Sequence, residues 1–360
     1  TKTVGDSGPR VFESFRARWE VFHEDGSPPN PDFHAYDTAA HNACRATAGF
    51  GDLVLASSSG LDEIGQAGPG ELVGPLVAQN GRFLRYATYY NQAEFDYIVQ
   101  NKLYRRDALP EVPSPRPVTP VLRFPEGSIA IKASWIDLTG IAAEERQRYY
   151  TRAAIVRDPA GGRCSRVTVG LAGLHIVQKT PSRPQWIWAS FEQVDVVPPA
   201  RMNAPEKFLL HDGKAAAMPA ENPLPLVPLP RQAKPFNVER SNSAPIHPHT
   251  ALANLKYERL LKDTVWANYQ LVVTQWPRLD GDQSVPVPAT RNGDVSNTFP
   301  GLGATSAFAN VTMETFDQGR PQLGCMNCHN QARMAGDFMW SVLDHAYPAK
   351  LAPAAGAVRR

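Results

Sequence analysis

The density of proline limits the fold of this chain more than any other feature of the sequence. Thirty-three of the 360 residues are proline, about 9%, against a usual share of ~5%. Proline lacks a backbone N–H and breaks helices, so this chain cannot form a long helical bundle. Prolines crowd residues 110–120 and 198–248. We expect an extended linker at the first stretch and a strap laid over the protein surface at the second.

Several segments have the alternation of apolar and polar residues that is typical of β-strands. In residues 128–135, for example, Ile129, Ile131 and Trp135 fall on one face and Lys132 on the other. Similar strands are expected at 11–22, 82–90, 148–157, 166–179 and 185–194. The sequence therefore predicts an α+β fold with a predominantly antiparallel β-sheet, a few helices and long proline-rich loops.

The N-terminus of one helix can be predicted from a capping motif. Asn91-Gln92-Ala93-Glu94 has the pattern of a capping box, in which the Asn91 side chain accepts a bond from the backbone of Glu94 and the Glu94 carboxylate returns to the backbone of Asn91. Phe95, Ile98 and Leu103 follow at helical spacing, so one face of this helix should be buried. A second, short helix is expected at 306–318.

The charge balance excludes one broad class of function. Thirty-seven basic and 35 acidic side chains leave a net charge of +2. Binding to nucleic-acid phosphates requires clustered lysine and arginine, so no nucleic-acid partner is expected. The sequence has no run of 18 apolar residues, so no membrane-spanning helix is expected either.

The cysteines carry the most specific signal. Two of the four, Cys325 and Cys328, stand in Cys325-Met326-Asn327-Cys328-His329, a C-x-x-C-H pattern. This is the pattern of covalent c-type haem attachment, in which two thiols bond the vinyl groups of one haem and the adjacent imidazole ligates its iron. The pattern therefore assigns Cys325 and Cys328 to the attachment of one haem c and His329 to the iron.

Three alternatives to haem stay open for this motif. A thioredoxin-like dithiol needs a strand directly before the first cysteine, and residues 319–324 have the composition of a loop. A tetrahedral zinc site needs a second pair of ligands, and Cys44 and Cys164 are too scattered to form one. A chance match without any cofactor is the third alternative.

Haem attachment indicates export, because the usual bacterial machinery attaches the group outside the cytoplasm. The sequence begins at Thr1 with polar residues rather than with a methionine and an apolar segment, so we expect a periplasmic or otherwise exported protein whose signal peptide has been removed. An oxidising compartment favours disulfides. Cys44–Cys164 is the intrachain pair left once the other two cysteines hold haem, and the alternative is two unrelated buried thiols.

The chain divides into four regions by composition. Residues 1–120 form an N-terminal α+β region, 121–200 an antiparallel β region, 201–250 the proline-rich strap, and 251–360 a C-terminal haem-binding region. The alternative is that all four pack as one compact unit.

The haem segment also resembles a known family. Gly336-Asp337-Phe338-Met339-Trp340 follows the motif closely, and Phe124-Pro125-Glu126-Gly127-Ser128-Ile129-Ala130-Ile131-Lys132 lies upstream. In this order the two stretches resemble cytochrome c′-beta and its lysine-crosslinked, hydroxylamine-oxidising relatives, although here they lie much farther apart. The resemblance implies a mostly antiparallel β fold and a high-spin haem with an open distal site. It also implies that Lys132 is the lysine bonded to the porphyrin; alternatively, Lys132 is an outward-facing strand lysine.

Two further residues are candidates for acid–base chemistry beside the haem. His175 lies in an otherwise apolar strand and would project from an apolar wall. Glu192 shares one face of the next strand with Trp186 and Trp188. The alternatives are a core histidine with its own hydrogen-bond partner, and a solvated glutamate at a strand end with the two tryptophans in the core.

The sequence thus predicts an exported monohaem c-type cytochrome whose haem is accessible to a small redox substrate such as hydroxylamine, nitric oxide or peroxide. A chain of 360 residues is much longer than an electron carrier needs, which favours a substrate pocket. The alternative is an electron-transfer cytochrome with a six-coordinate haem that serves a larger redox partner. None of the six methionines stands in a context that singles it out as a sixth ligand.

Overall fold

A computed structural model of the protein describes residues 10–35, 37, 44, 51–55, 64–67, 75–114, 120–158, 162–198, 207–213, 235–240, 246–277, 295–297, 308–318 and 325–347. Thr1 and most of the expected 198–248 strap lie outside these residues, and so does part of the 110–120 linker.

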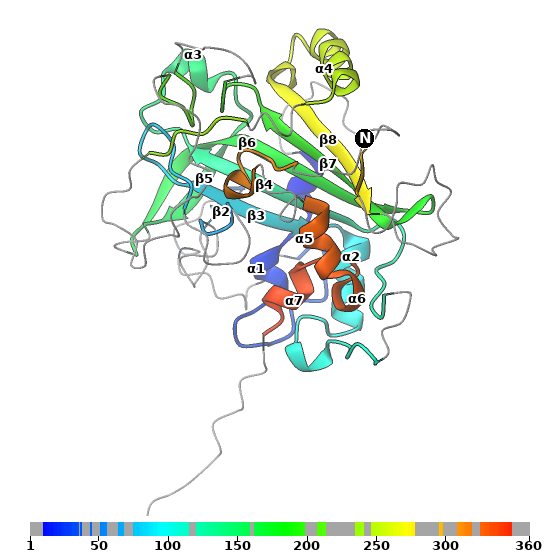
Figure 1. Cartoon of the computed structure of the whole chain (residues 1–360). Coiled ribbons are helices and arrows are strands. Elements are labelled where there is room, and N and C mark those ends of the chain that lie inside the picture. The colour runs from blue at the N-terminus through cyan, green and yellow to red at the C-terminus, as the bar shows by residue number, and fades with distance from the viewer. Residues whose placement is uncertain are drawn as a thin grey trace, which may run out of the picture.

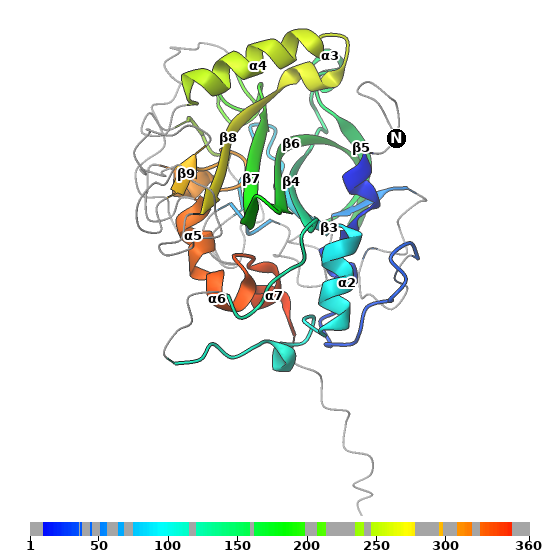
Figure 2. The same ribbon diagram turned by 90° about the vertical axis from the view of Figure 1, so that its right-hand side faces the viewer.

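The described strands pair into one nine-stranded sheet. The strands are β1 (Arg16–Ala17), β2 (Leu53–Leu55), β3 (Leu84–Tyr90), β4 (Ile129–Asp137), β5 (Thr151–Arg157), β6 (Cys164–Thr180), β7 (Arg183–Gln193), β8 (Tyr269–Pro277) and β9 (Val295–Asn297). Their order is β1-β3-β4-β6-β7-β8-β9, while β5 pairs with β6 and with β2. Every pairing is antiparallel except β2–β5. The sheet is therefore mixed, and it curves into a half-barrel (Figure 2).

Five of the expected strands are confirmed, with ends that differ by a few residues, but the strand at 11–22 is wrong. That segment forms a 3₁₀ helix (η1, Val11–Ser14), the two-residue β1 and a short helix, α1 (Arg18–Val21). The Glu20 carboxylate accepts hydrogen bonds from the Arg16 guanidinium and from the backbone N–H of Ala17. These local bonds stabilise a helical turn in place of a longer strand.

The remaining helices lie around the rim of the sheet. They are α2 (Gln92–Gln100), α3 (Ala143–Arg146), α4 (Pro248–Leu260), α5 (Cys325–Gln331), α6 (Arg333–Gly336) and α7 (Ser341–His345), with 3₁₀ turns η3 (Arg106–Ala108), η4 (Val265–Asn268) and η5 (Thr315–Asp317). Both ribbon views place α5, α6 and α7 at the opposite end of the sheet from α4 (Figures 1 and 2). None of the helices in the described ranges combines the length and the apolar character needed to cross a membrane.

The α2 helix confirms half of the expected capping box. The Asn91 side chain accepts a hydrogen bond from Glu94 N at 3.2 Å, and Phe95 and Ile98 are fully buried. The Glu94 carboxylate does not return to the cap, because it is itself fully buried and neither of its oxygens has a hydrogen-bond partner among the described residues.

The expected helix at 306–318 is also wrong where the structure describes it. Residues 308–318 form turns with only the short η5. The Asn310 side chain accepts a bond from Thr312 N at 2.9 Å and donates one to the carbonyl of Phe191 at 3.0 Å. These bonds tie the segment to β7 and compete with helix formation. Gly173 of β6 permits the close approach, because a Cβ there would lie 2.2 Å from the Thr312 hydroxyl.

The disulfide expected between Cys44 and Cys164 is present. Cys164 begins β6, pairs in register with Arg157 of β5, and packs with Ile155. The bond joins Cys44 to the sheet across a sequence separation of 120 residues.

Candidate functional site

A row of polar side chains crosses one face of the sheet. Thr88 of β3 is in register with Lys132 of β4, Lys132 with His175 of β6, and His175 with Ser190 of β7. Residues in register on neighbouring strands share a face, and all four side chains line one cavity. Alternation along each strand therefore places this row on the face of the sheet that lines the cavity.

A more apolar row runs beside it, two residues farther along each strand. Tyr90, Ala130, Val177 and Trp188 are in register across the same four strands, and all four line the cavity. They belong to a core cluster that also takes in Phe95 and Ile98 of α2 and Phe338 and Val342 near α7. One face of the sheet thus lines the cavity with a polar row and an adjacent apolar row, which we call the polar wall and the apolar wall.

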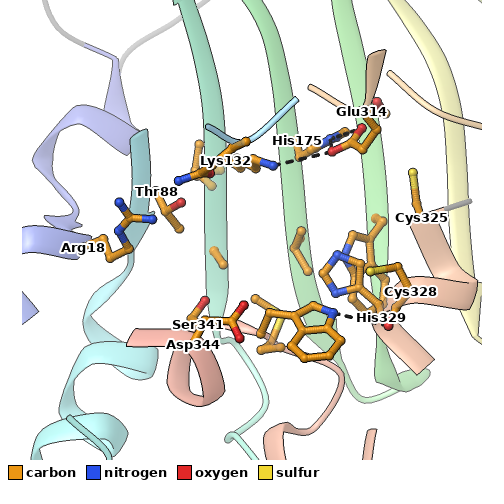
Figure 3. Close-up of a pocket in the computed structure, with 18 of the residues that line it drawn as sticks. Arg18, Thr88, Lys132, His175, Glu314, Cys325, Cys328, His329, Ser341 and Asp344 are labelled. Atoms are coloured by element: carbon orange, nitrogen blue, oxygen red, sulfur yellow. Dashed lines mark hydrogen bonds and ion pairs between the residues drawn. The ribbon is translucent and has the colours of Figure 1, made fainter. Parts of the chain in front are cut away.

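The cavity has a volume of about 540 Å³, within the range of roughly 300–1,000 Å³ that is usual for ligand and cofactor sites. Cys325, Cys328 and His329 line it together with Lys132 and His175. In Figure 3 Lys132 and His175 lie at the top of the view and Cys328 and His329 at the lower right. Three elements distant in sequence, β4, β6 and α5, therefore bring five of the six predicted site residues to one place.

The α5 helix explains how the two cysteines reach the cavity together. Cys325 and Cys328 are three residues apart in the helix and so share one face. Both thiols are free and half-buried, and Cys325 Sγ donates to the carbonyl of Phe308 at 3.3 Å. Burial raises the pKa of both thiols, so both carry their protons at neutral pH. Protonated thiols are poor metal ligands and poor redox nucleophiles.

His329 is held in one orientation by a backbone carbonyl. Its Nδ1 lies 2.7 Å from the oxygen of Phe338, and because a carbonyl only accepts, Nδ1 must carry the proton. Burial lowers the pKa of His329 to about 4, so the ring is neutral at neutral pH. The lone pair on Nε2 of His329 is then available to bind a metal ion.

Glu314 completes a cluster on the polar wall that the sequence did not reveal. Its two carboxylate oxygens lie 3.1 and 3.2 Å from His175 Nε2, and Lys132 Nζ lies 3.6 Å from Oε1. Burial alone would raise the pKa of Glu314, but His175, Lys132 and the backbone N–H of Asn310 together lower it to about 2. We call Lys132, His175 and Glu314 the acid–base cluster.

No sequence signal pointed to Glu314. It lies in the segment predicted to be a helix, eleven residues before Cys325, and only the bonds that fold residues 308–318 back onto β7 bring it to the cavity.

Glu192, the sixth predicted site residue, does not line the cavity. It is fully buried beneath the 308–318 segment, where it pairs with the Arg240 guanidinium and accepts a bond from Val311 N at 2.8 Å. Glu192 therefore supports the segment that carries Glu314. Trp188 lines the cavity, with its ring 5.3 Å from that of His329, whereas Trp186 is enclosed in the core.

The arrangement does not favour a zinc centre. Within the described ranges, no three His, Cys, Asp or Glu side chains converge as the ligands of a metal ion do. Zinc sites in proteins are built from such convergent sets, usually of four ligands.

Comparisons with protein-family models, with curated proteins and with solved structures find no match to this chain. Its function is therefore inferred from the residues of the cavity.

Proposed function

We propose that the protein is an exported monohaem c-type cytochrome whose haem is accessible to a small redox substrate. Cys325 and Cys328 would hold the haem through two thioethers, and His329 would be the proximal ligand. The observation that carries the proposal is that both free thiols and the neutral imidazole line one cavity that also has an apolar wall.

The donor chemistry of the cavity fits this group. A haem iron needs one imidazole nitrogen with a free lone pair rather than a convergent ligand set, and Nε2 of His329 supplies it. Trp188, Val177 and Ala130 offer the apolar surface that a porphyrin ring requires. When bound, the haem would supply one-electron redox chemistry and an iron position for a small molecule.

The acid–base cluster would serve the substrate side of the cavity. Lys132 and His175 can donate hydrogen bonds, and Glu314, which its low pKa keeps ionised, accepts them and stabilises the protonated His175 ring. The cluster can therefore hold or move a proton at His175 Nε2 while a substrate such as hydroxylamine, nitric oxide or peroxide gains or loses electrons. The Glu314 carboxylate would keep the His175 ring in one orientation, as carboxylates do in other acid–base pairs.

The other side chains in the cavity that could act as a sixth iron ligand have hydrogen-bond partners or constrained positions, which supports an iron position open to a substrate. Of the methionines whose side chains the structure describes, Met339 alone lines the cavity, and it adjoins Phe338, whose carbonyl binds His329. The two other imidazoles in the cavity are engaged: His175 with Glu314, and His345 with Arg18 at 3.1 Å.

Lys132 would also be the lysine bonded to the porphyrin, if the family resemblance extends to this residue. Its Nζ lies in the cavity and its side chain is 27% exposed, so it can reach a flat group lying on the apolar wall. Peptide mapping of the haem-bearing protein tests this, because a crosslink joins the peptide of Lys132 to the peptide of Cys325 and Cys328.

The proposal is tested by the optical spectrum of protein made with an export signal and the haem-attachment machinery. We expect haem bands that survive denaturation and acid extraction, and a reduced spectrum that shifts on addition of carbon monoxide. The Cys325→Ala/Cys328→Ala variant should lose all covalent haem, while the control Cys44→Ala/Cys164→Ala should retain it. A wild-type protein without haem bands would overturn the proposal.

A sharp low-spin spectrum that carbon monoxide does not change would give a different answer. It would mean a six-coordinate iron and would favour an electron-transfer cytochrome that serves a larger redox partner. The Cys44–Cys164 disulfide supports the proposed periplasmic or otherwise exported location, which cell fractionation tests directly.

A further inference from the structure

The residue that holds His329 belongs to a turn with an unfavourable backbone conformation. Asp337 and Phe338 follow α6 and both have positive φ angles, 50° and 69°. Non-glycine residues rarely adopt this region, and two in succession need strong support from their surroundings. The carbonyl of Phe338 in this turn accepts the bond from His329 Nδ1.

The support is a buried ion pair. The Asp337 carboxylate accepts a hydrogen bond from the backbone N–H of Phe124 at 2.9 Å and pairs with the Lys179 ammonium. The side chains of Asp337 and Lys179 are only 2% and 6% exposed. Lys179 lies at the end of β6, the strand that carries His175, and its ammonium is 5.5 Å from the centre of the Trp186 ring.

Stability alone is a weak reason for such a pair. Two charges removed from water lose more hydration than their attraction returns, and apolar side chains often replace a buried pair without cost. In some proteins a buried pair is instead retained for the conformation that it selects. Here the conformation is the turn that directs the carbonyl of Phe338 at His329.

We propose that Lys179 and Asp337 are positioning residues for the axial histidine. Their ion pair fixes the 337–338 turn, the turn fixes the carbonyl of Phe338, and that carbonyl fixes the tautomer and orientation of His329. This inference rests on the proposed haem function and extends it to a pair that does not line the cavity.

The pair would also set the electron donation of the imidazole. A hydrogen bond from Nδ1–H to a carbonyl makes the Nε2 lone pair more basic, which strengthens the bond to iron and stabilises the oxidised state. A loosened turn weakens that hydrogen bond. The iron–histidine bond should then weaken and the reduction potential should rise.

The experiment compares haem-bearing wild type with Asp337→Asn, which keeps the size of the side chain and an acceptor for Phe124 N. We expect the iron–histidine stretching band of the reduced protein to move to lower frequency and the reduction potential to shift upward, with the haem content unchanged. Lys179→Met should shift both in the same direction, and Lys179→Arg should restore them toward wild type.

A matched control separates positioning from general destabilisation. Arg152 forms an ion pair of 2.5 Å with Glu13, whose side chain is 3% exposed against 17% for Arg152. Neither residue lines the cavity. Arg152→Met should lower stability without moving the band or the potential. Where a single variant fails to fold, Asp337→Asn/Lys179→Met removes both buried charges together and is expected to show the same two shifts.

Loss of haem binding and loss of histidine positioning give different experimental results. Wild-type protein without covalent haem would overturn the proposed function itself. Wild-type protein with a normal haem, combined with Asp337 and Lys179 variants whose band and potential do not move, would overturn the positioning role alone.

Discussion

Lys132 and His175 stand directly opposite each other on β4 and β6, and both side chains enter the cavity. Two basic groups in register on adjacent strands repel when both are charged. The negative charge of Glu314, on a different segment, offsets this repulsion. Its carboxylate lies 3.6 Å from Lys132 Nζ and 3.1 Å from His175 Nε2. The sheet thus supplies two members of the acid–base cluster, and the 308–318 segment supplies the third.

Glu314→Gln should slow turnover of a small redox substrate by about 10²–10⁴-fold, the usual range for loss of a positioned acid or base. The amide keeps the shape of the side chain but carries no charge, so it neither orients His175 nor stabilises the protonated form of its ring. Initial rates with hydroxylamine, normalised to haem content, provide the measurement.

The control for this prediction is Glu145→Gln in α3, an exposed glutamate that does not line the cavity. Its rate should equal that of wild type. Equal rates for Glu314→Gln and Glu145→Gln would remove Glu314 from the mechanism.

Glu192→Gln should lower the free energy of unfolding by about 3–5 kcal/mol, because it leaves the buried Arg240 guanidinium without its counter-charge. Urea denaturation of the two proteins measures the difference. The double variant Glu192→Gln/Arg240→Met removes both charges and should recover part of the loss. A single variant as stable as wild type, but slow in turnover, would return Glu192 to a catalytic role.

The strands could be predicted because their signals are local. Alternation in 128–135 and 166–179 gave β4 and β6, and the same alternation placed Lys132 and His175 on strand faces. The C-x-x-C-H spacing is also local and indicated that Cys325, Cys328 and His329 lie together, while their role in binding haem stays a prediction. What local patterns could not show is which strands are neighbours, and hence that Lys132 and His175 are in register.

The positions of three glutamates could not be predicted from the sequence, and the physical cause is the same for all three. Glu94 fitted a capping box and Glu192 fitted a pocket wall, yet both are buried by segments far away in sequence. Glu314 was missed for the same reason, since its position depends on the bond between Asn310 and the carbonyl of Phe191. Such long-range burial overrides local pattern and leaves no periodic signal.

Removing the disulfide should destabilise the protein by about 2–5 kcal/mol, because the crosslink closes a loop of 120 residues and restricts the unfolded chain. The Cys44→Ala/Cys164→Ala variant and chemical denaturation measure the loss. A reducing agent should shift the wild type toward the variant and leave the variant itself unchanged. A reductant effect of equal size on both proteins would show that the stabilisation comes from elsewhere.

Glu94 should make the protein less stable as the pH rises toward 8. Burial raises the pKa of Glu94 from 4.5 to about 8. The negative charge of Asp337 adds to this increase, and the positive charge of Lys179 partly offsets it. Between these values the folded chain keeps a proton that the unfolded chain has released, so raising the pH favours unfolding, by at most about 1.4 kcal/mol per pH unit. Above about pH 8 the effect ends.

The pKa of Asp337 is also raised by burial, to about 6, so the clearest window for Glu94 lies between about pH 6.5 and 8. In this window Glu94→Gln should flatten the fall of unfolding free energy with pH, measured by urea denaturation at several pH values. Asp96→Asn, on the same helix but only partly buried, should keep the wild-type slope. Equal slopes in wild type and Glu94→Gln would mean that the Glu94 carboxyl is already ionised in the folded protein.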